Sequence, residues 1–293
     1  MTTLRWVMVL WLLGGSGPSG WAQDAANPSS ALAYRFELST RLSLQLDGAP
    51  IRHGLELVMD LDLVRRGQRG EDLELRIVAI EARVVGAARP ASYSSRRSPK
   101  IEGAFDETAA RGFDALVLNA SIGEIGPRGE IWSLRPPELY RETLSTQDSP
   151  LDLIVECFCG RPRRLPPGTA RAVWQCSTDL LGVPLLLRAD ETLQEAMPPE
   201  ASVTLHRVGT PGIDTLRRDE IKDRYGESLC ERILQLRFGR AEVRAELQID
   251  ERTGLPDRAQ VQAHWQFELP EADDSGSSAG EGRLGWTLRR RVN

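Results

Sequence analysis

The sequence predicts a mainly β (α+β) fold: a large curved antiparallel sheet, or half-barrel meander, with one or two short helices packed on its apolar face. Residues 34–46 alternate apolar and polar side chains without a break, and residues 51–63 repeat the alternation after a turn at 47–50. The same pattern returns in residues 241–249, 259–269 and 284–288. A period of two places the apolar side chains on one face of each strand.

The first two strands form a predicted hairpin with long arms. Each arm exceeds the usual length of about 3–10 residues, which predicts a wide sheet. A sheet that is apolar on one face only must curve over a cover. Leu73, Leu75 and Ile77 continue the pattern, and the phase changes before Ile80. This change predicts a β-bulge in the third strand.

Three carboxylates, Glu56, Asp60 and Asp62, share the polar face of the second strand. Calcium binds several oxygen ligands, so these residues are candidate ligands. Successive residues on one face lie about 7 Å apart, however, which is too far for one strand to build a site. We therefore interpret this face as solvated, with Arg35 or Arg41 of the first strand as cross-strand partners.

The C-terminal third is predicted to be a meander with a long loop. Residues 271–282 are acidic and rich in Ser and Gly, which is typical of a mobile loop. The loop contains the pattern Gly276-x-Ser278-x-Gly280 of serine-hydrolase nucleophiles. That nucleophile needs a strand before the serine and a helix after it, so we do not interpret Ser278 as catalytic.

One helix is predicted over residues 150–159, from the candidate N-cap Ser149 to Gly160. Its apolar residues follow helical spacing, although the segment also alternates as a strand; the residues at its two ends favour the helix. A second short helix is predicted over residues 219–225.

The four cysteines are candidates for disulfide bonds, because an even count in an exported chain suggests bridges. Three connectivities are available if all are paired, and Cys157 or Cys159 with Cys176 is the preferred bridge. Zinc is the competing interpretation, but the pattern lacks the closely spaced cysteine pairs of structural zinc sites. The candidates are Cys157, Cys159, Cys176 and Cys230.

Four tryptophans are candidates for lining an apolar cavity, although scattered tryptophans are more often core anchors. Of the three histidines, His53 falls on the apolar face of the second strand and is expected to be a hydrogen-bonded core residue. His206 and His264 are isolated. The tryptophans are Trp132, Trp174, Trp265 and Trp286.

The N-terminus is typical of a signal peptide, with Arg5 before an apolar run and small residues, Gly20 and Ala22, at a cleavage site. We expect a signal peptide at 1–22, a linker at 23–31 and one β-rich domain at 32–293. The domain could also be two β halves, 32–135 and 165–293, joined by a helical segment at 138–160. The expected location is periplasmic or extracellular, without stable membrane insertion after cleavage.

Composition excludes some functions. The net charge is −5 with both signs interspersed, so the chain lacks the basic surface that nucleic acid requires. The motifs of nucleotide-binding loops and zinc proteases are absent from the sequence. We expect no cofactor, no metal and no enzymatic activity.

Several short motifs together carry a family resemblance. They are the Tyr34-x-Phe36 strand, a segment at 118–132 with a Gly-Pro-Arg-Gly turn, the Leu-Pro-Pro-Gly run at 165–168 before Trp174, and the Asp250-to-Gly254 hairpin. In these motifs the chain resembles an uncharacterised family of exported bacterial β-rich proteins, and it departs from the family's Gly-Asp pair at 171–173. The resemblance implies a fold and a compartment but no activity.

Three functions from different classes follow. The first is a binding or scaffold module of the bacterial envelope, holding an apolar ligand on the concave sheet or docking an envelope protein. The second is a structural or assembly protein with no small ligand. The third is an outer-membrane β-barrel, against which the 6% aromatic content and the capped helix both argue.

Overall fold

The computed structural model describes residues 31–46, 49–66, 72–86, 91–125, 131–138, 153–154, 158, 171–180, 183–194, 202–213, 215–250, 255–270 and 277–291. The strands are β1 (Leu32–Leu46), β2 (Ala49–Arg66), β3 (Asp72–Val85), β4 (Ala91–Ser94), β5 (Ile101–Glu102), β6 (Ser121–Ile125), β7 (Ile131–Arg135), β8 (Arg171–Leu180), β9 (Val183–Gln194), β10 (Ser202–Ile213), β11 (Arg237–Asp250), β12 (Pro256–Pro270) and β13 (Ser277–Arg290). The helices are α1 (Glu107–Leu118), the 3-10 turn η2 (Thr215–Arg217), α4 (Arg218–Tyr225) and α5 (Glu227–Leu234).

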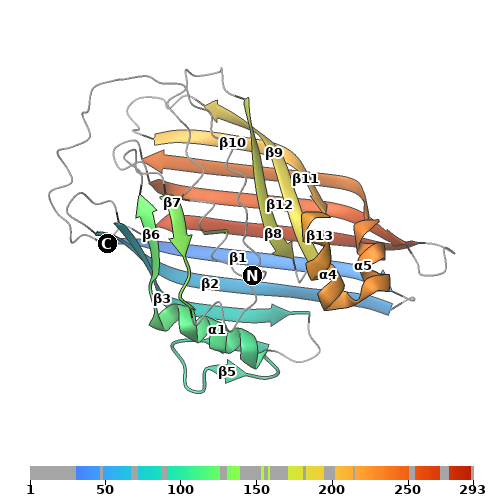
Figure 1. Cartoon of the computed structure of the whole chain (residues 1–293), viewed down its shortest axis with the longest axis horizontal. Coiled ribbons are helices and arrows are strands. Elements are labelled where there is room, and N and C mark those ends of the chain that lie inside the picture. The colour runs from blue at the N-terminus through green and yellow to red at the C-terminus, as the bar shows by residue number, and fades with distance from the viewer. Residues whose placement is uncertain are drawn as a thin grey trace.

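All the strands belong to one 13-stranded sheet in which neighbours run antiparallel, as the sequence predicts (Figure 1). The order along the sheet is β5-β4-β3-β2-β1-β13-β12-β11-β10-β9-β8, with β6 and β7 attached beside β3. The described strands do not close into a barrel, because this order ends at β5 on one side and at β8 on the other. The first and last strands, β1 and β13, lie side by side in the interior of the sheet.

The apolar face of the sheet is the core of the protein. The alternating apolar residues of eight strands are buried on this face and form one cluster with residues of α1. Leu153, Ile154 and Phe158 of the predicted helix at 150–159 are helical and belong to the same cluster. The ring of Phe158 meets that of Tyr34 edge-on at a centroid distance of 5.3 Å. This contact packs a helical residue against β1; the rest of that predicted helix lies outside the described residues.

The predicted bulge in β3 is confirmed at Val78. Asp60 of β2 pairs with Ala79 and Leu61 pairs with Ile77, so Val78 is the extra residue. Val78 is exposed while Ile77 and Ala79 are buried on either side of it. The bulge lets two stretches of β3 with opposite phase keep their apolar residues on the core face.

The loop predicted at 271–282 is wrong for residues 277–282, which form the first part of β13. Glycine here is paired with large aromatic residues: Gly280 lies opposite Phe267 and Gly282 opposite Trp265. The two rings lie where side chains of the glycines would otherwise stand. Ser278 is accordingly a buried strand residue. Residues 271–276 lie outside the described residues.

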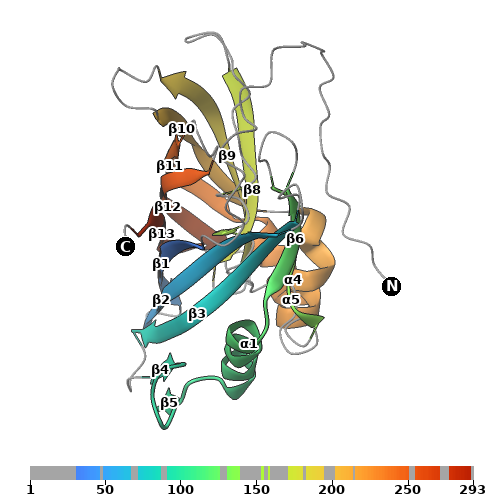
Figure 2. The same ribbon diagram turned by 90° about the vertical axis from the view of Figure 1, so that its left-hand side faces the viewer.

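The helices cover the apolar side of the sheet. Figure 2 shows α1, α4 and α5 on one side of it, and no described helix lies on the other. The predicted helix at 219–225 corresponds to α4, whereas α1 and α5 were not predicted. Helix α1 begins after Asp106, whose side chain accepts a hydrogen bond from the Thr108 N–H. Within the described ranges no helix has the length and apolarity to cross a membrane.

Candidate functional site

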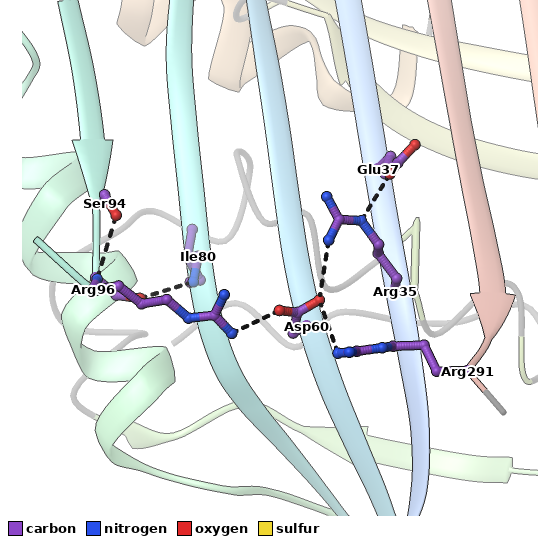
Figure 3. Close-up of polar contacts among 8 residues, drawn as sticks. Arg35, Glu37, Asp60, Ile80, Ser94, Arg96 and Arg291 are labelled. Atoms are coloured by element: carbon purple, nitrogen blue, oxygen red, sulfur yellow. Dashed lines mark hydrogen bonds and ion pairs between the residues drawn. The ribbon is translucent and has the colours of Figure 1, made fainter. Parts of the chain in front are cut away.

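A buried carboxylate surrounded by three arginines lies on the polar face of the sheet. Asp60 of β2 forms ion pairs with Arg96 at 2.7 Å, Arg291 at 3.5 Å and Arg35 at 3.7 Å (Figure 3). We call these four residues the Asp60 cluster. The Asp60 side chain is 9% exposed, and the three arginine side chains are about half exposed. The cluster joins β2 to β1, to the residue after β13 and to the turn after β4.

Local backbone contacts bring Arg96 to Asp60. The Ser95 N–H donates to the Ile80 carbonyl at 2.9 Å, and the Ile80 N–H donates to Ser95 Oγ at 3.0 Å. The Arg96 N–H donates to Ser94 Oγ at 3.3 Å. These bonds hold the turn after β4 against the bulged part of β3, so that the Arg96 side chain extends across β3 to the carboxylate (Figure 3).

Each Asp60 oxygen has a different role. Oδ2 accepts a hydrogen bond from Arg96 Nη2 at 2.7 Å. Oδ1 is within ion-pair distance of Arg35 and Arg291 but accepts no hydrogen bond among the described residues. A hydrogen bond to Glu37 and the negative charge of Asp60 raise the pKa of Arg35, although partial burial opposes them. The arginines are therefore held by charge and keep hydrogen-bond donors available at the surface.

The cluster continues along the sheet as a row of arginines. Arg35 of β1 lies directly opposite Arg289 of β13, which lies directly opposite Arg258 of β12. We call Arg35, Arg289 and Arg258 the arginine row. Opposed like charges on neighbouring strands are destabilising, so the fold carries an unfavourable interaction here. An unfavourable interaction of this kind, with no nearby contact to offset it, is expected at functional sites.

The chemistry available to these residues is anion binding. Arginine stays protonated at all physiological pH values and offers several donors in a planar fork, so it cannot act as a general base. Within the described ranges, no three His, Cys, Asp or Glu side chains lie close enough together to hold a metal ion. The carboxylates of Glu56 and Asp60 instead pair with Arg41 at 3.4 Å and with Arg35, the partners expected from the sequence.

A second group of polar residues lines a pocket between α1 and the β4–β5 hairpin. The Tyr93 hydroxyl donates to Asp114 Oδ1 at 2.6 Å, and Lys100 Nζ donates to the same oxygen at 2.7 Å. Burial and the hydrogen bond to Asp114 raise the pKa of Tyr93. The pocket has a volume of about 170 Å³, and Glu107 and Arg111 complete its polar lining. The phenol is thereby kept protonated, which suits a structural hydrogen bond better than proton transfer.

A second hollow, of about 200 Å³, opens on the polar face over β10, β11 and β12. His206 and Glu246 lie opposite each other across β10 and β11 and contribute to its lining. Glu246 Oε2 accepts from Gln260 Nε2 at 3.1 Å, so its charge is already hydrogen-bonded. This hollow contains no arrangement of nucleophile and base.

The predicted tryptophan lining is distributed over the sheet. Trp265 and Trp286 are buried on the apolar face, and Trp286 packs 6.2 Å from Phe36 between ring centroids. Trp132 lies in β7 and Trp174 in β8, and their side chains are outside the described residues. The two described tryptophans are core anchors, so a ligand-lining role for the four stays a prediction.

One of the candidate disulfide cysteines is a free thiol. Cys230 of α5 is buried and unpaired, and it packs against Ile221 and Ile233. Its Sγ lies 3.7 Å from the Arg218 carbonyl oxygen as a weak donor. A bridge that includes Cys230 is therefore wrong. Cys157, Cys159 and the side chain of Cys176 lie outside the described residues, so a bridge among them stays a prediction.

The histidines do not form a site. His53 is exposed, which corrects its predicted place in the core. The position falls near the start of β2, where its cross-strand neighbour Leu42 is only half-buried. His264 Nε2 lies 3.7 Å from Glu281 on the polar face of β12 and β13.

Sequence reasoning found two residues of the Asp60 cluster and missed two. Asp60 and Arg35 share a hairpin, so their pairing follows from alternation alone. Arg96 and Arg291 come from a turn and from the end of β13, and their approach depends on tertiary structure. The only sequence signal for Arg291 is the basic run at 289–291.

Comparison with known proteins identifies no family. No family model and no curated protein matches the chain. Among solved structures, a DUF1329 family protein from Desulfovibrio piger is 11% identical, with 90% of this chain and 88% of that chain covered and a TM-score of 0.17. A domain provisionally assigned to outer membrane lipoprotein sorting, from Vibrio parahaemolyticus, is 7% identical, with 89% and 86% covered and a TM-score of 0.14. Likenesses at these TM-scores indicate no function for this chain.

Proposed function

We propose that the protein is a non-enzymatic binding or scaffold module of the bacterial envelope that holds an apolar ligand between its sheet and its helices. The observation that supports this is the one-sided cover of the sheet. The apolar face is continuous from β3 to β11, and separate short helices lie over it, with β6 and β8 on the same side (Figure 2). A cover made of separate pieces can open over part of the face without unfolding the sheet.

The contact between Tyr34 and Phe158 is the place where such an opening is best tested. Both side chains are buried, and the edge-on contact joins β1 to the helical residues near 158. Withdrawal of Phe158 would uncover the ring of Tyr34, which belongs to the same apolar cluster as Phe36 and Trp286. Apolar surface of this kind is the common lining of small-molecule sites.

The test is native mass spectrometry of the protein purified from cells that export it. A co-purifying apolar molecule, released by organic solvent and replaced by a fluorescent fatty acid, supports the proposal. Phe158→Ala enlarges the space and is expected to strengthen probe binding, whereas Val78→Ala, on the exposed bulge, serves as the control and leaves it unchanged. Protein that carries no molecule and binds no probe contradicts it.

A structural role without a small ligand is the second candidate, and the completeness of the core favours it. Tyr34, Phe36, Met59 and Leu61 are all fully buried, so the described part of the apolar face is already covered by protein. The same measurements decide between the two candidates, because a purely structural module yields clean mass and no probe binding.

A further inference from the structure

We propose that the arginine row and the Asp60 cluster together form a binding site for a compact phosphate-bearing anion on the polar face of the sheet. This site lies on the face opposite the apolar core, so the inference is independent of the function proposed above.

The spacing of the row suits several phosphoryl groups. Arg35, Arg289 and Arg258 stand in direct register on three adjacent strands. Neighbouring strands lie about 4.8 Å apart, so the three side chains start within about 10 Å of one another. Guanidinium groups bind phosphate oxygens in a bidentate manner, which makes arginine the residue suited to this geometry.

The arginines of the row are incompletely neutralised by the protein. Arg289 is exposed and has no ion-pair partner among the described residues. Arg258 donates from Nη2 to the neutral amide of Gln260 at 2.8 Å, and its buried Nε has no hydrogen-bond partner in the described part of the chain. Arg35 alone is paired with carboxylates, Glu37 and Asp60.

The surrounding charges leave the site positive. Arg96 and Arg291 add two further guanidinium groups, both held by Asp60. Three further carboxylates lie near the site on this face. Asp62 lies directly opposite Arg76 of β3, the charge of Glu81 of β3 acts on Arg35, and Glu246 of β11 accepts a hydrogen bond from Gln260. The row and the cluster thus hold five arginines, more than the carboxylates beside them, and an anion placed on the row would relieve the repulsion between Arg289 and its neighbours.

The charge of the whole chain indicates the size of the anion. The net charge is −5, so the positive site is a local exception on an acidic protein. An extended anionic surface, such as a membrane, would be repelled by the remainder of the molecule. A compact soluble anion contacts the arginines alone, and we therefore propose such an anion as the ligand.

Isothermal titration of the purified protein with inorganic tripolyphosphate at low ionic strength tests the site. We expect saturable binding that weakens as salt is added. Arg289→Gln and Arg258→Gln are each expected to weaken binding by roughly tenfold, as for loss of one charge-assisted hydrogen bond. Arg244→Gln is the matched control, because Arg244 is an exposed arginine of β11 that already pairs with Glu242. It should change the affinity less than about twofold.

Three results would overturn the proposal: no saturable binding of tripolyphosphate, full affinity retained in both row variants, or an equal loss in Arg244→Gln. Circular dichroism of each variant confirms that the fold is intact. A second titration, with phosphatidylglycerol vesicles, tests whether the face binds a membrane surface instead. Vesicle binding without tripolyphosphate binding would assign the face to a membrane and would also overturn the proposal.

Discussion

The indole of Trp265 lies over Gly282 of the neighbouring strand, so closely that a Cβ on Gly282 would stand 2.3 Å from the indole Cε2. The two residues are directly opposite in the β12–β13 pair. Glycine in a strand usually weakens it, but here the missing side chain leaves the space that the ring fills.

Gly282→Ala is expected to destabilise the protein by about 1–3 kcal/mol, because the added methyl group overpacks a buried ring. Urea unfolding measures the change. Gly239→Ala is the control: Gly239 also lies in a strand, and a Cβ there meets nothing within 4 Å. That variant should be neutral or up to about 1 kcal/mol more stable. Equal effects of the two substitutions would contradict the packing we describe.

Asp60→Asn is expected to destabilise the fold by about 2 kcal/mol. The substitution leaves three arginines close together without their carboxylate, and the cost is moderated because those arginines are half exposed. Glu56→Gln is the matched control on the same strand, since its pair with Arg41 is long and exposed. Its effect should stay within about 0.5 kcal/mol. Urea midpoints of both variants decide whether the Asp60 cluster stabilises the sheet.

The raised pKa of Tyr93 predicts that the folded protein loses stability at high pH. Its pKa is raised in the folded state above the ordinary value of 10.0, by burial and by the Asp114 hydrogen bond. Above that value the unfolded chain binds fewer protons than the folded one, so stability falls as pH rises past 10. The fall contributed by this residue approaches about 1.4 kcal/mol per pH unit.

Urea unfolding of the wild type and of Tyr93→Phe at about pH 9 and pH 11 isolates this contribution. The variant is expected to be less stable at the lower pH, because it lacks the hydrogen bond to Asp114. Its stability should then decline less steeply than that of the wild type. Parallel declines in the two proteins would show that the Tyr93 phenol does not titrate as the structure implies.

Cys230 is expected to be unreactive in the folded protein and reactive after unfolding, because the thiol is buried between α4 and α5. Intact mass after alkylation in denaturant without reductant should show a label that Cys230→Ala removes. The same labelling counts the thiols among the other three cysteines. A Cys230→Ala protein with an unchanged label count would show that Cys230 is bridged.

The fold was predictable where alternation is long and uninterrupted. The hairpin of β1 and β2, the bulge at Val78 and the pairing of Asp60 with Arg35 all follow from period-two patterns. The first part of β13 was missed because its glycines give the composition of a loop, and their compensation lies across the sheet in Phe267 and Trp265. Composition along one strand cannot show what a neighbouring strand supplies.

The candidate site was only half predictable for a related reason. Arg96 reaches Asp60 from a turn whose position depends on the bonds between Ser95 and Ile80. Likewise, the arginine row exists only because β1 lies beside β13 and β13 beside β12. Neither arrangement follows from local spacing, since each requires the strand order of the whole sheet.

The neighbouring positions of β1 and β13 determine when the sheet can be completed. Phe36 pairs with Leu288, so the seam between the two halves of the sheet closes only after nearly the whole chain has been made. Contacts of such high sequence separation form slowly. Until the seam closes, β1 and β13 each present an open edge to other chains. A chain of this topology benefits from protection during synthesis, and deletion of β13 should yield aggregated protein rather than a smaller folded one.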